Sequence, residues 1–336
     1  MSGWDDAKFS NSESAPEIFV YHQSMKSELT GRPQALTAAS TVGVVSLASM
    51  ADSTAIEAGC RALRSSSGWP CEVRQAPIWL GNFAGTVEER VAALFELWQR
   101  DNVAAIVCAR GGYGANYVLP GFAEILKMQK RPKAFVGYSD NTALLLTLER
   151  VGIACFHGPM VASDFACGRA DEQSFLAALR GEPLDFAFSA GSEVRTLIPG
   201  EAHGTITGGC LSLVVASLGT PWEIETKGKV LFLEDVNEKP YRVDRMLWQL
   251  FLAKKFSGVQ AVIFGEMLGC KTAGPEQETL PQMIQRILKG CGVPIVYGFP
   301  SGHVSQKNLM LPFGVPSTLD ASESGIRLRV EASTTL

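Results

Sequence analysis

The chain has 336 residues, of which 46% are hydrophobic, so it is long enough for two domains that each bury a core. Its formal net charge of −4 argues against nucleic acid or an anionic membrane as the main partner. The eight cysteines form no CxxC pair, which favours free thiols in a reducing compartment. No secretory leader is recognisable, and residues 35–50 are too polar to span a bilayer. A cytoplasmic protein is therefore expected.

The first part of the chain predicts an α/β fold. Residues 1–38 are polar and irregular and are interpreted as a tail, and the first buried strand is expected at residues 41–47. A helix is expected at residues 52–63, and a second helix begins at a capping box formed by Thr86 and Glu89. Apolar strands that alternate with amphipathic helices indicate a parallel sheet, whose site lies at the carboxyl ends of the strands.

Two turns follow strands of this sheet at those ends. Residues 104–108 form a fully apolar strand that leads into a glycine-rich turn at residues 110–114. Residues 134–138 form another strand, which leads into Ser139 and a helix that stops at Gly152. The sequence therefore predicts a first domain over residues 39–165 with a site at these two turns.

A weaker pattern separates this domain from a second one. Residues 166–200 contain one expected helix followed by a Gly-, Ser- and Glu-bearing segment, which is interpreted as a linker. The second domain is expected over residues 201–336. Its predicted elements are strands at residues 230–233, 259–264, 294–297 and 326–330 and helices at residues 241–254 and 279–288.

Ser139 is the candidate nucleophile. A strand, a sharp turn and a helix place a serine at a helix N-terminus, where its hydroxyl is exposed. The segment GYSDN keeps only the first glycine of the G-x-S-x-G pattern, and a serine in such a turn also suits a simple helix cap. A serine hydroxyl needs a base and an oxyanion site before it can act as a nucleophile.

A histidine is the expected base, and the chain has four. His22 lies in the polar tail and His203 precedes an apparent strand, so both fit structural or solvated roles. His157 ends a strand and fits either a site-lining or a hydrogen-bonded loop residue. His303 lies in a Gly-Ser loop directly after a strand, where a catalytic base can be placed.

A carboxylate is expected to orient this base. Glu234 ends an otherwise apolar strand, and Asp235 is the alternative, although either side chain could instead cap a helix. The N–H groups of Gly112 and Asp140 are the candidate oxyanion donors. The glycine pair at 111–112 also fits a tight turn or, less well, a phosphate loop. No metal-binding or cofactor motif is present in the sequence.

Five short motifs in this order resemble the LD-carboxypeptidases, the serine peptidase family of murein tetrapeptide carboxypeptidases and the related microcin-immunity hydrolases. They are ARGGYG at 109–114, GYSD at 137–140, HGP at 157–159, LEDV at 233–236 and SGH at 301–303. The resemblance covers residues 41–330 and leaves the tail unassigned.

The resemblance implies a Ser-Glu-His triad formed by Ser139, Glu234 and His303. It implies a flavodoxin-like N-terminal domain with helices on both faces of its sheet and a swivelling β/α C-terminal domain. The implied reaction removes the terminal D-alanine of murein tetrapeptides, without a cofactor, during peptidoglycan recycling. A homodimer is also implied.

Two arginines are candidates for substrate recognition, and two alternative functions also fit the sequence. A carboxypeptidase needs a cation for the free carboxylate, and Arg110 and Arg242 are the candidates. Gly111 and Tyr113, in the motif of Arg110, are also predicted to bind substrate. One alternative is an immunity-type hydrolase of aminoacyl-adenylate-like amides, and another is a two-domain protein that binds a small ligand without catalysis.

Overall fold

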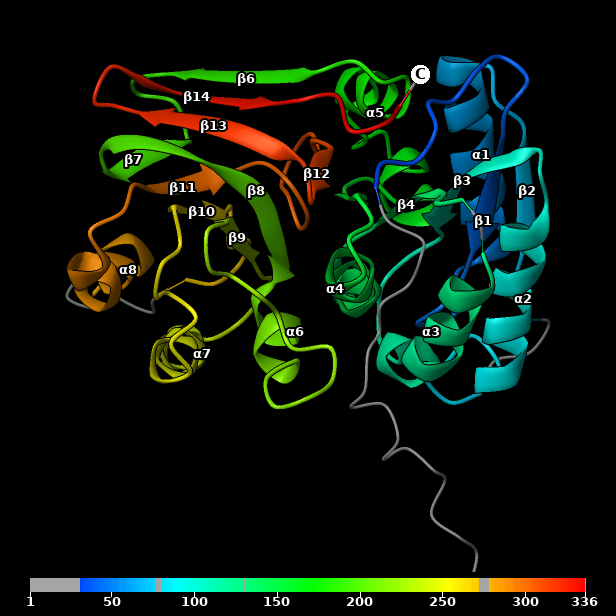
Figure 1. Ribbon diagram of the computed structural model, residues 1–336, viewed down its shortest axis with the longest axis horizontal. Coiled ribbons are helices and arrows are strands. Elements are labelled where there is room, and N and C mark those ends of the chain that lie inside the picture. The colour runs from blue at the N-terminus through cyan, green and yellow to red at the C-terminus, as the bar shows by residue number, and fades with distance from the viewer. Residues whose placement is uncertain (1–30, 77–79, 130, 272–277, 336) are drawn as a thin grey trace, which may run out of the picture.

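The computed structural model describes residues 31–76, 80–129, 131–271 and 278–335. Two sheets stand side by side, and the expected two-unit α/β architecture is confirmed (Figure 1). The first sheet has the order β12-β5-β4-β3-β1-β2, and β1 to β5 are parallel, as in flavodoxin-like sheets. Its strands are β1 (Thr41–Val45), β2 (Cys71–Arg74), β3 (Val103–Cys108), β4 (Ala134–Gly137), β5 (Cys155–His157) and β12 (Leu311–Phe313).

Helices cover both faces of this first sheet. Figure 1 shows α1 on one side and α2 and α3 on the other. The predicted capping box opens α2, because Thr86 accepts from the Glu89 N–H while the Glu89 carboxylate accepts from the Thr86 N–H. The elements are α1 (Ser53–Ser67), α2 (Val87–Gln99), η2 (Ala115–Val118), α3 (Leu119–Met128), η3 (Ser139–Asn141), α4 (Thr142–Arg150), η4 (Val161–Phe165) and α5 (Glu172–Leu179).

The second sheet is mixed and has the order β6-β14-β13-β8-β9-β10-β11-β7. Its central strands β8 to β11 are parallel, and antiparallel strands flank them on both sides. The strands are β6 (Leu184–Ser189), β7 (Arg195–Ile198), β8 (Gly200–Cys210), β9 (Val230–Glu234), β10 (Ala261–Gly265), β11 (Ile295–Phe299), β13 (Pro316–Ala321) and β14 (Gly325–Val330). The helices are α6 (Leu211–Ala216), α7 (Pro240–Leu252), α8 (Leu280–Leu288) and the short η5 (Lys289–Cys291).

The segment at 166–200 is more ordered than its composition suggests. It forms α5 as expected, but it also supplies the edge strands β6 and β7 of the second sheet. In β6, Leu184 and Phe186 are buried, whereas Asp185, Ala187 and Ser189 are exposed. A strand this short, in which buried and exposed residues alternate, gives only a weak signal in the sequence.

Apolar packing joins the two units. The inner faces of β9 and β11 place Phe232 and Phe299 in one continuous core with the first sheet, and Phe186 packs edge-on against Phe299. The opposite face of the second sheet packs against α6, α7 and α8 through residues such as Leu231 and Leu247. The junction of the units is therefore a packed interior rather than a loose linker.

Polar contacts at the junction bring α4 against the second sheet. The Cys210 N–H at the end of β8 donates to Thr142 Oγ1, 3.1 Å away, at the start of α4. At the other end of α4, Glu149 is buried and receives Lys229 Nζ at 3.1 Å. Because α4 begins three residues after Ser139, these contacts fix the serine turn relative to β8 and its neighbour β9.

The described part of the tail packs on the fold. Leu36 is buried, its N–H donates to the Leu179 carbonyl, and Gly31 pairs with Ile153. His22 lies outside the described residues. All eight cysteines are free. Within the described ranges, no helix combines the length and the hydrophobicity that a bilayer crossing requires.

Candidate functional site

Ser139 lies on the sharp turn that the sequence predicts. β4 ends at Gly137, Ser139 opens η3, and α4 follows at Thr142. The φ angle of Ser139 is +61°, a left-handed conformation that is uncommon for a residue with a side chain. The side chain is partly exposed while its neighbours are buried. This strained turn therefore presents the hydroxyl at the carboxyl end of the first sheet.

The glycine-rich turn after β3 faces this serine. A Cβ on Gly111 would lie 2.8 Å from Ser139 Oγ and 3.5 Å from the Asp140 nitrogen, so only glycine allows this approach. Asn141 Nδ2 donates to the Arg110 carbonyl at 3.2 Å. The two predicted turns are thus brought together.

Asp140 stabilises the same turn through a hydrogen bond. Its carboxylate accepts the Ala115 N–H at 2.7 Å, just past the glycines. Burial raises the pKa of Asp140, against the opposing effects of this bond and of the Arg90 guanidinium. Arg90 is itself buried and donates to the carbonyls of Leu47 and Gly114 at 2.7 and 2.8 Å. A buried cation and a buried carboxylate therefore hold the backbone around the serine.

Glu234 and His303 form a direct pair. His303 Nδ1 lies 2.8 Å from Glu234 Oε2, and the His303 backbone N–H donates to the same oxygen at 3.0 Å. Asp235 instead accepts from the N–H groups of Ser212 at 2.9 Å and Val236 at 2.8 Å, so it caps the start of α6. Of the two adjacent carboxylates, Glu234 is the one that contacts the histidine.

The electrostatics of this pair favour charge on both partners. Glu234 is fully buried, which alone would raise its pKa, but the charge of His303, its hydrogen bond and the nearby His157 ring outweigh burial and hold the pKa at about 2. Burial lowers the pKa of His303, yet the attraction of Glu234 exceeds it, so the net change is upward. The carboxylate is therefore ionised at neutral pH and supports a protonated imidazole.

Tyr138 connects this pair to the serine turn. The His303 ring packs edge-on against the Tyr138 ring, with centroids 5.1 Å apart, and Tyr138 directly precedes Ser139. No hydrogen bond joins Ser139 to His303 in the described parts of the chain. The structure thus packs the Glu234–His303 pair against Tyr138, the residue that directly precedes Ser139.

The remaining candidates have different surroundings. Arg110 is exposed, and Tyr113 is half exposed and stacks on Phe83. Arg242 pairs with Glu238 at 3.2 Å in the first turn of α7. His203 is exposed on β8, where its Nδ1 lies 3.2 Å from Thr318 Oγ1.

Gly112, the other proposed oxyanion donor, is exposed and has a φ angle of +119°.

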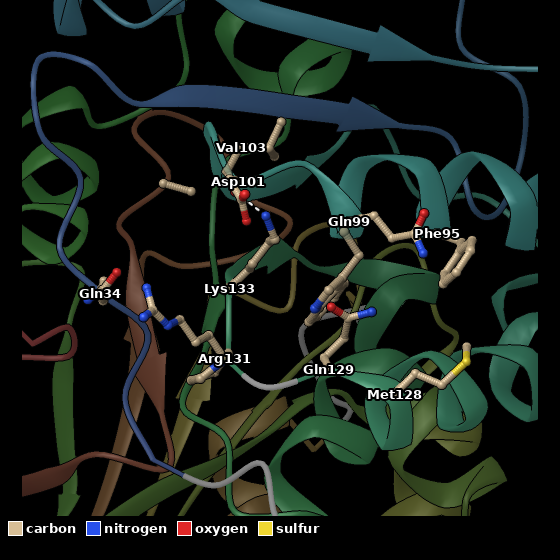
Figure 2. A pocket seen from close by; sticks show the side chains of 12 residues that line it. Gln34, Phe95, Gln99, Asp101, Val103, Met128, Gln129, Arg131 and Lys133 are labelled. Carbon is tan, nitrogen blue, oxygen red and sulfur yellow. Dashed lines mark hydrogen bonds between the residues drawn. The ribbon is translucent and has the colours of Figure 1, made fainter.

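A large cavity lies away from these residues. It has a volume of about 850 Å³ and is lined by residues such as Val103 and Lys133 (Figure 2). These residues lie where β3 and β4 begin, whereas Ser139 follows the opposite end of β4. Lys133 Nζ donates there to the carbonyls of Arg100 and Val103, so it stabilises the strand starts. Among the residues that the structure describes, no three His, Cys, Asp or Glu side chains are grouped to hold a metal ion.

Comparison with known proteins identifies the family. Residues 42–158 match the family model for the LD-carboxypeptidase N-terminal domain, and residues 203–319 match the one for the C-terminal domain. The chain belongs to the LD-carboxypeptidase family. The two matches cover both parts of the fold that contain the sequence motifs.

Individual relatives agree with this assignment. A "Probable murein peptide carboxypeptidase" of Bacillus subtilis is 33% identical over 303 residues, which are 88% of this chain and 93% of the relative. The microcin C7 self-immunity protein MccF of Escherichia coli is 26% identical and covers 73% of this chain and 79% of its own length. The crystal structure of a muramoyltetrapeptide carboxypeptidase from Oxalobacter formigenes superposes with a TM-score of 0.78 at 25% identity, over 88% of this chain and all of that one.

Several residues of this LD-carboxypeptidase contact Glu234 although the sequence did not predict these contacts. His157, which was assigned no definite role, is fully buried, and its Nε2 lies 3.8 Å from Glu234 Oε1. Gly302 has a φ angle of +93°, and a Cβ there would come within 2.6 Å of Glu234 Cδ. The HGP and SGH motifs contain both positions, but each lies about 70 to 80 residues from Glu234 in the sequence.

Gly111 offers a test of the contact with Ser139. In this LD-carboxypeptidase, Gly111→Ala is expected to lower catalytic activity by about 100-fold with little loss of stability, because the new methyl displaces the Ser139 hydroxyl. The φ angle of Gly111 is not positive, so alanine fits its backbone. Gly290→Ala is the control, since no atom of the residues that the structure describes lies within 4 Å of its Cβ position. Equal activity of the two variants would contradict the assigned contact.

Proposed function

We propose that the chain is a serine carboxypeptidase that hydrolyses the L,D-peptide bond to the terminal D-alanine of murein tetrapeptides in peptidoglycan recycling. The observation that carries the proposal is the pair of buried Glu234 and partly buried His303, which packs on Tyr138 directly beside the strained turn of Ser139. Family membership and the names of the relatives support the same reaction class.

In the proposed mechanism, Ser139 attacks the carbonyl of the residue that precedes the terminal D-alanine. His303 Nδ1 is engaged by Glu234, so Nε2 is the ring nitrogen that takes the serine proton. Glu234 stabilises the resulting imidazolium. The N–H groups of Gly112 and Asp140 stabilise the developing oxyanion by donating hydrogen bonds to it.

The intermediate then collapses to an acyl-enzyme and D-alanine. His303 returns its proton to the leaving amine, water enters, and His303 removes a proton from that water as it attacks the ester. The second tetrahedral intermediate then breaks its bond to Ser139. His303 returns the proton to the Ser139 oxygen, and the tripeptide is released. No metal or organic cofactor takes part in these steps.

Arg110 is the favoured partner for the substrate's terminal carboxylate. It belongs to the same turn as Gly111, which faces Ser139, and its guanidinium is exposed. Arg242 is already paired with Glu238 and is the second candidate. We place Tyr113, half exposed beside the same turn, at the rim of the substrate site. Assembly as a homodimer stays a prediction from the family resemblance, and action in the cytoplasm stays a prediction from the sequence.

Mass spectrometry of murein tetrapeptide incubated with the protein tests the proposal. The expected product has lost one alanine, and the same peptide ending in L-alanine should remain intact. Cleavage of aminoacyl-adenylate analogues in place of the tetrapeptide would instead support the immunity-type function. Cleavage of neither, together with failure of a fluorophosphonate to label Ser139, would favour a binding protein.

A further inference from the structure

Ser49 lies where three loops meet at the carboxyl end of the first sheet. It follows the end of β1, and its side chain is partly exposed. The loop after β2 contributes Asn82 to this meeting point, and the glycine-rich turn after β3 contributes Tyr113. The proposed mechanism does not use Ser49, although the turn that it contacts faces Ser139.

Both hydrogen bonds of the Ser49 hydroxyl have a fixed direction. The Tyr113 backbone N–H donates to Ser49 Oγ at 3.1 Å, because an amide N–H can only donate. Ser49 Oγ donates to the Asn82 carbonyl at 2.7 Å, because a carbonyl oxygen can only accept. The single hydrogen of the hydroxyl is thereby used toward Asn82, and one side chain joins the loop after β2 to the glycine-rich turn.

Gly112 allows the serine to come this close. Its φ angle is +119°, and a Cβ at this position would lie 2.3 Å from Ser49 Oγ and 2.5 Å from Ser49 Cβ. Such distances exclude a side chain, so Ser49 packs directly on the Gly112 backbone. The peptide that Ser49 binds, between Gly112 and Tyr113, comes directly after the N–H proposed to stabilise the oxyanion.

The glycine-rich turn has no side chain of its own at its centre to hold it in place. Other residues hold its two ends, at the Arg110 carbonyl and the Ala115 N–H. Ser49 supplies the contact between these ends, beside a glycine pair whose backbone has wide conformational freedom. Within the described residues the Gly112 N–H has no acceptor, so it is available to a substrate oxygen.

We propose that Ser49 is a positioning residue that holds the peptide after Gly112, so that the Gly112 N–H is directed at the oxyanion. This inference deepens the proposed function and rests on it for every catalytic effect. An oxyanion donor must lie within about 2.7–3.1 Å of the oxygen on which charge develops. Without the Ser49 hydroxyl the turn can rotate, which weakens binding of the transition state more than binding of the substrate.

Ser49→Ala tests this role, because it removes both hydrogen bonds and leaves the backbone unchanged. With murein tetrapeptide, kcat is expected to fall about tenfold while KM stays within about twofold of the wild-type value. A murein tripeptide analogue whose terminal carboxyl is replaced by a boronic acid forms a tetrahedral adduct with Ser139. This analogue should bind about tenfold more weakly to the variant. A purely structural role would lower stability without separating these constants.

Ser67→Ala is the matched control. Ser67 Oγ also accepts a backbone N–H, from Trp69 at 3.0 Å, and donates to the Leu63 carbonyl at 2.6 Å. This serine ends α1, close to the amino end of β2 rather than to the glycine-rich turn. Its loss should leave kcat and the affinity for the boronic acid unchanged. Equal values of both constants in Ser49→Ala and Ser67→Ala would overturn the proposal.

Hydrogen exchange of the Tyr113 amide, followed by NMR, separates this inference from the proposed function. The Ser49 acceptor protects this amide, so its exchange in Ser49→Ala is expected to be about tenfold faster than in the wild type. This reading needs no catalysis. A wild-type protein that leaves the tetrapeptide intact would contradict the proposed function, whereas unchanged exchange of the Tyr113 amide would overturn the inference about Ser49.

Should Ser49→Ala not fold, Ser49→Cys replaces it. A thiol is a weaker donor and acceptor than a hydroxyl. The value of kcat, the affinity for the boronic acid and the protection of the Tyr113 amide are therefore expected to fall by smaller factors. Wild-type values of all three in a folded Ser49→Cys protein would reject the role of Ser49.

Discussion

Replacing Ser139 by alanine is expected to lower kcat for D-alanine release by about 10⁴-fold or more, because the variant has no hydroxyl to form the acyl-enzyme. The pair of Glu234 and His303 remains in place but has no proton to take. Release of D-alanine from murein tetrapeptide, followed with a coupled assay and by mass spectrometry, measures the effect.

The fold of this variant should be unchanged. Alanine removes the hydroxyl only, and the turn is held by the neighbouring Asp140 and Asn141 contacts. Ser66→Ala is a matched control, since the Ser66 hydroxyl donates to carbonyls of its own helix α1 and has no other partner in the described ranges. A Ser139→Ala protein with turnover within tenfold of the wild type would exclude Ser139 as the nucleophile.

Glu234→Gln is expected to lower kcat by about 10³- to 10⁴-fold while KM changes little. Glutamine keeps the shape of the side chain but carries no charge to stabilise the His303 imidazolium, and its amide can face His303 with the wrong group. Asp235→Asn is the control, because Asp235 caps α6 and does not bond to His303. A larger catalytic loss in Asp235→Asn than in Glu234→Gln would contradict the assignment.

The same substitution should change the dependence of stability on pH. The pKa of Glu234 is about 2 in the folded protein, below the value of about 4.3 for an unfolded glutamate. Its contribution to stability is therefore present above pH 4.3 and is lost as the pH falls toward 2. The raised pKa of His303 acts in the opposite sense, since its contribution is present below about pH 6.5 and is lost as the pH rises through the folded value.

Urea unfolding between pH 2 and pH 5 measures this effect. Stability of the wild type should fall over this range more steeply than that of Glu234→Gln, which has no carboxylate at this position to protonate. Parallel curves for the two proteins would show that Glu234 does not have a lowered pKa.

Much of the fold could be predicted because its signals are local. The apolar strands before Ser139 and before Glu234 and the capping box of α2 are all confirmed. Each was visible within about ten residues, where hydrophobic period and capping chemistry determine the element. The meeting of the Ser139 turn with the glycine-rich turn followed from one topological rule about parallel strands.

The rest depends on contacts between distant segments. Nothing near His157 in the sequence indicates that its ring lies against Glu234, because the contact needs β5 and β9 to meet across two sheets. The choice between Glu234 and Asp235 was decided by which carboxylate the start of α6 binds. The edge strands β6 and β12 were missed because three to six residues with proline or small polar members carry little periodic signal.

The loop that carries His303 is tied into both sheets. It leaves β11 at Phe299 in the second sheet and enters β12 at Leu311, which pairs antiparallel with β5 of the first. During translation β5 thus lacks its outer partner until residues 311–313 have left the ribosome, about 150 residues after β5 itself. A nascent chain released before residue 303 would carry Ser139 without the base of the proposed mechanism.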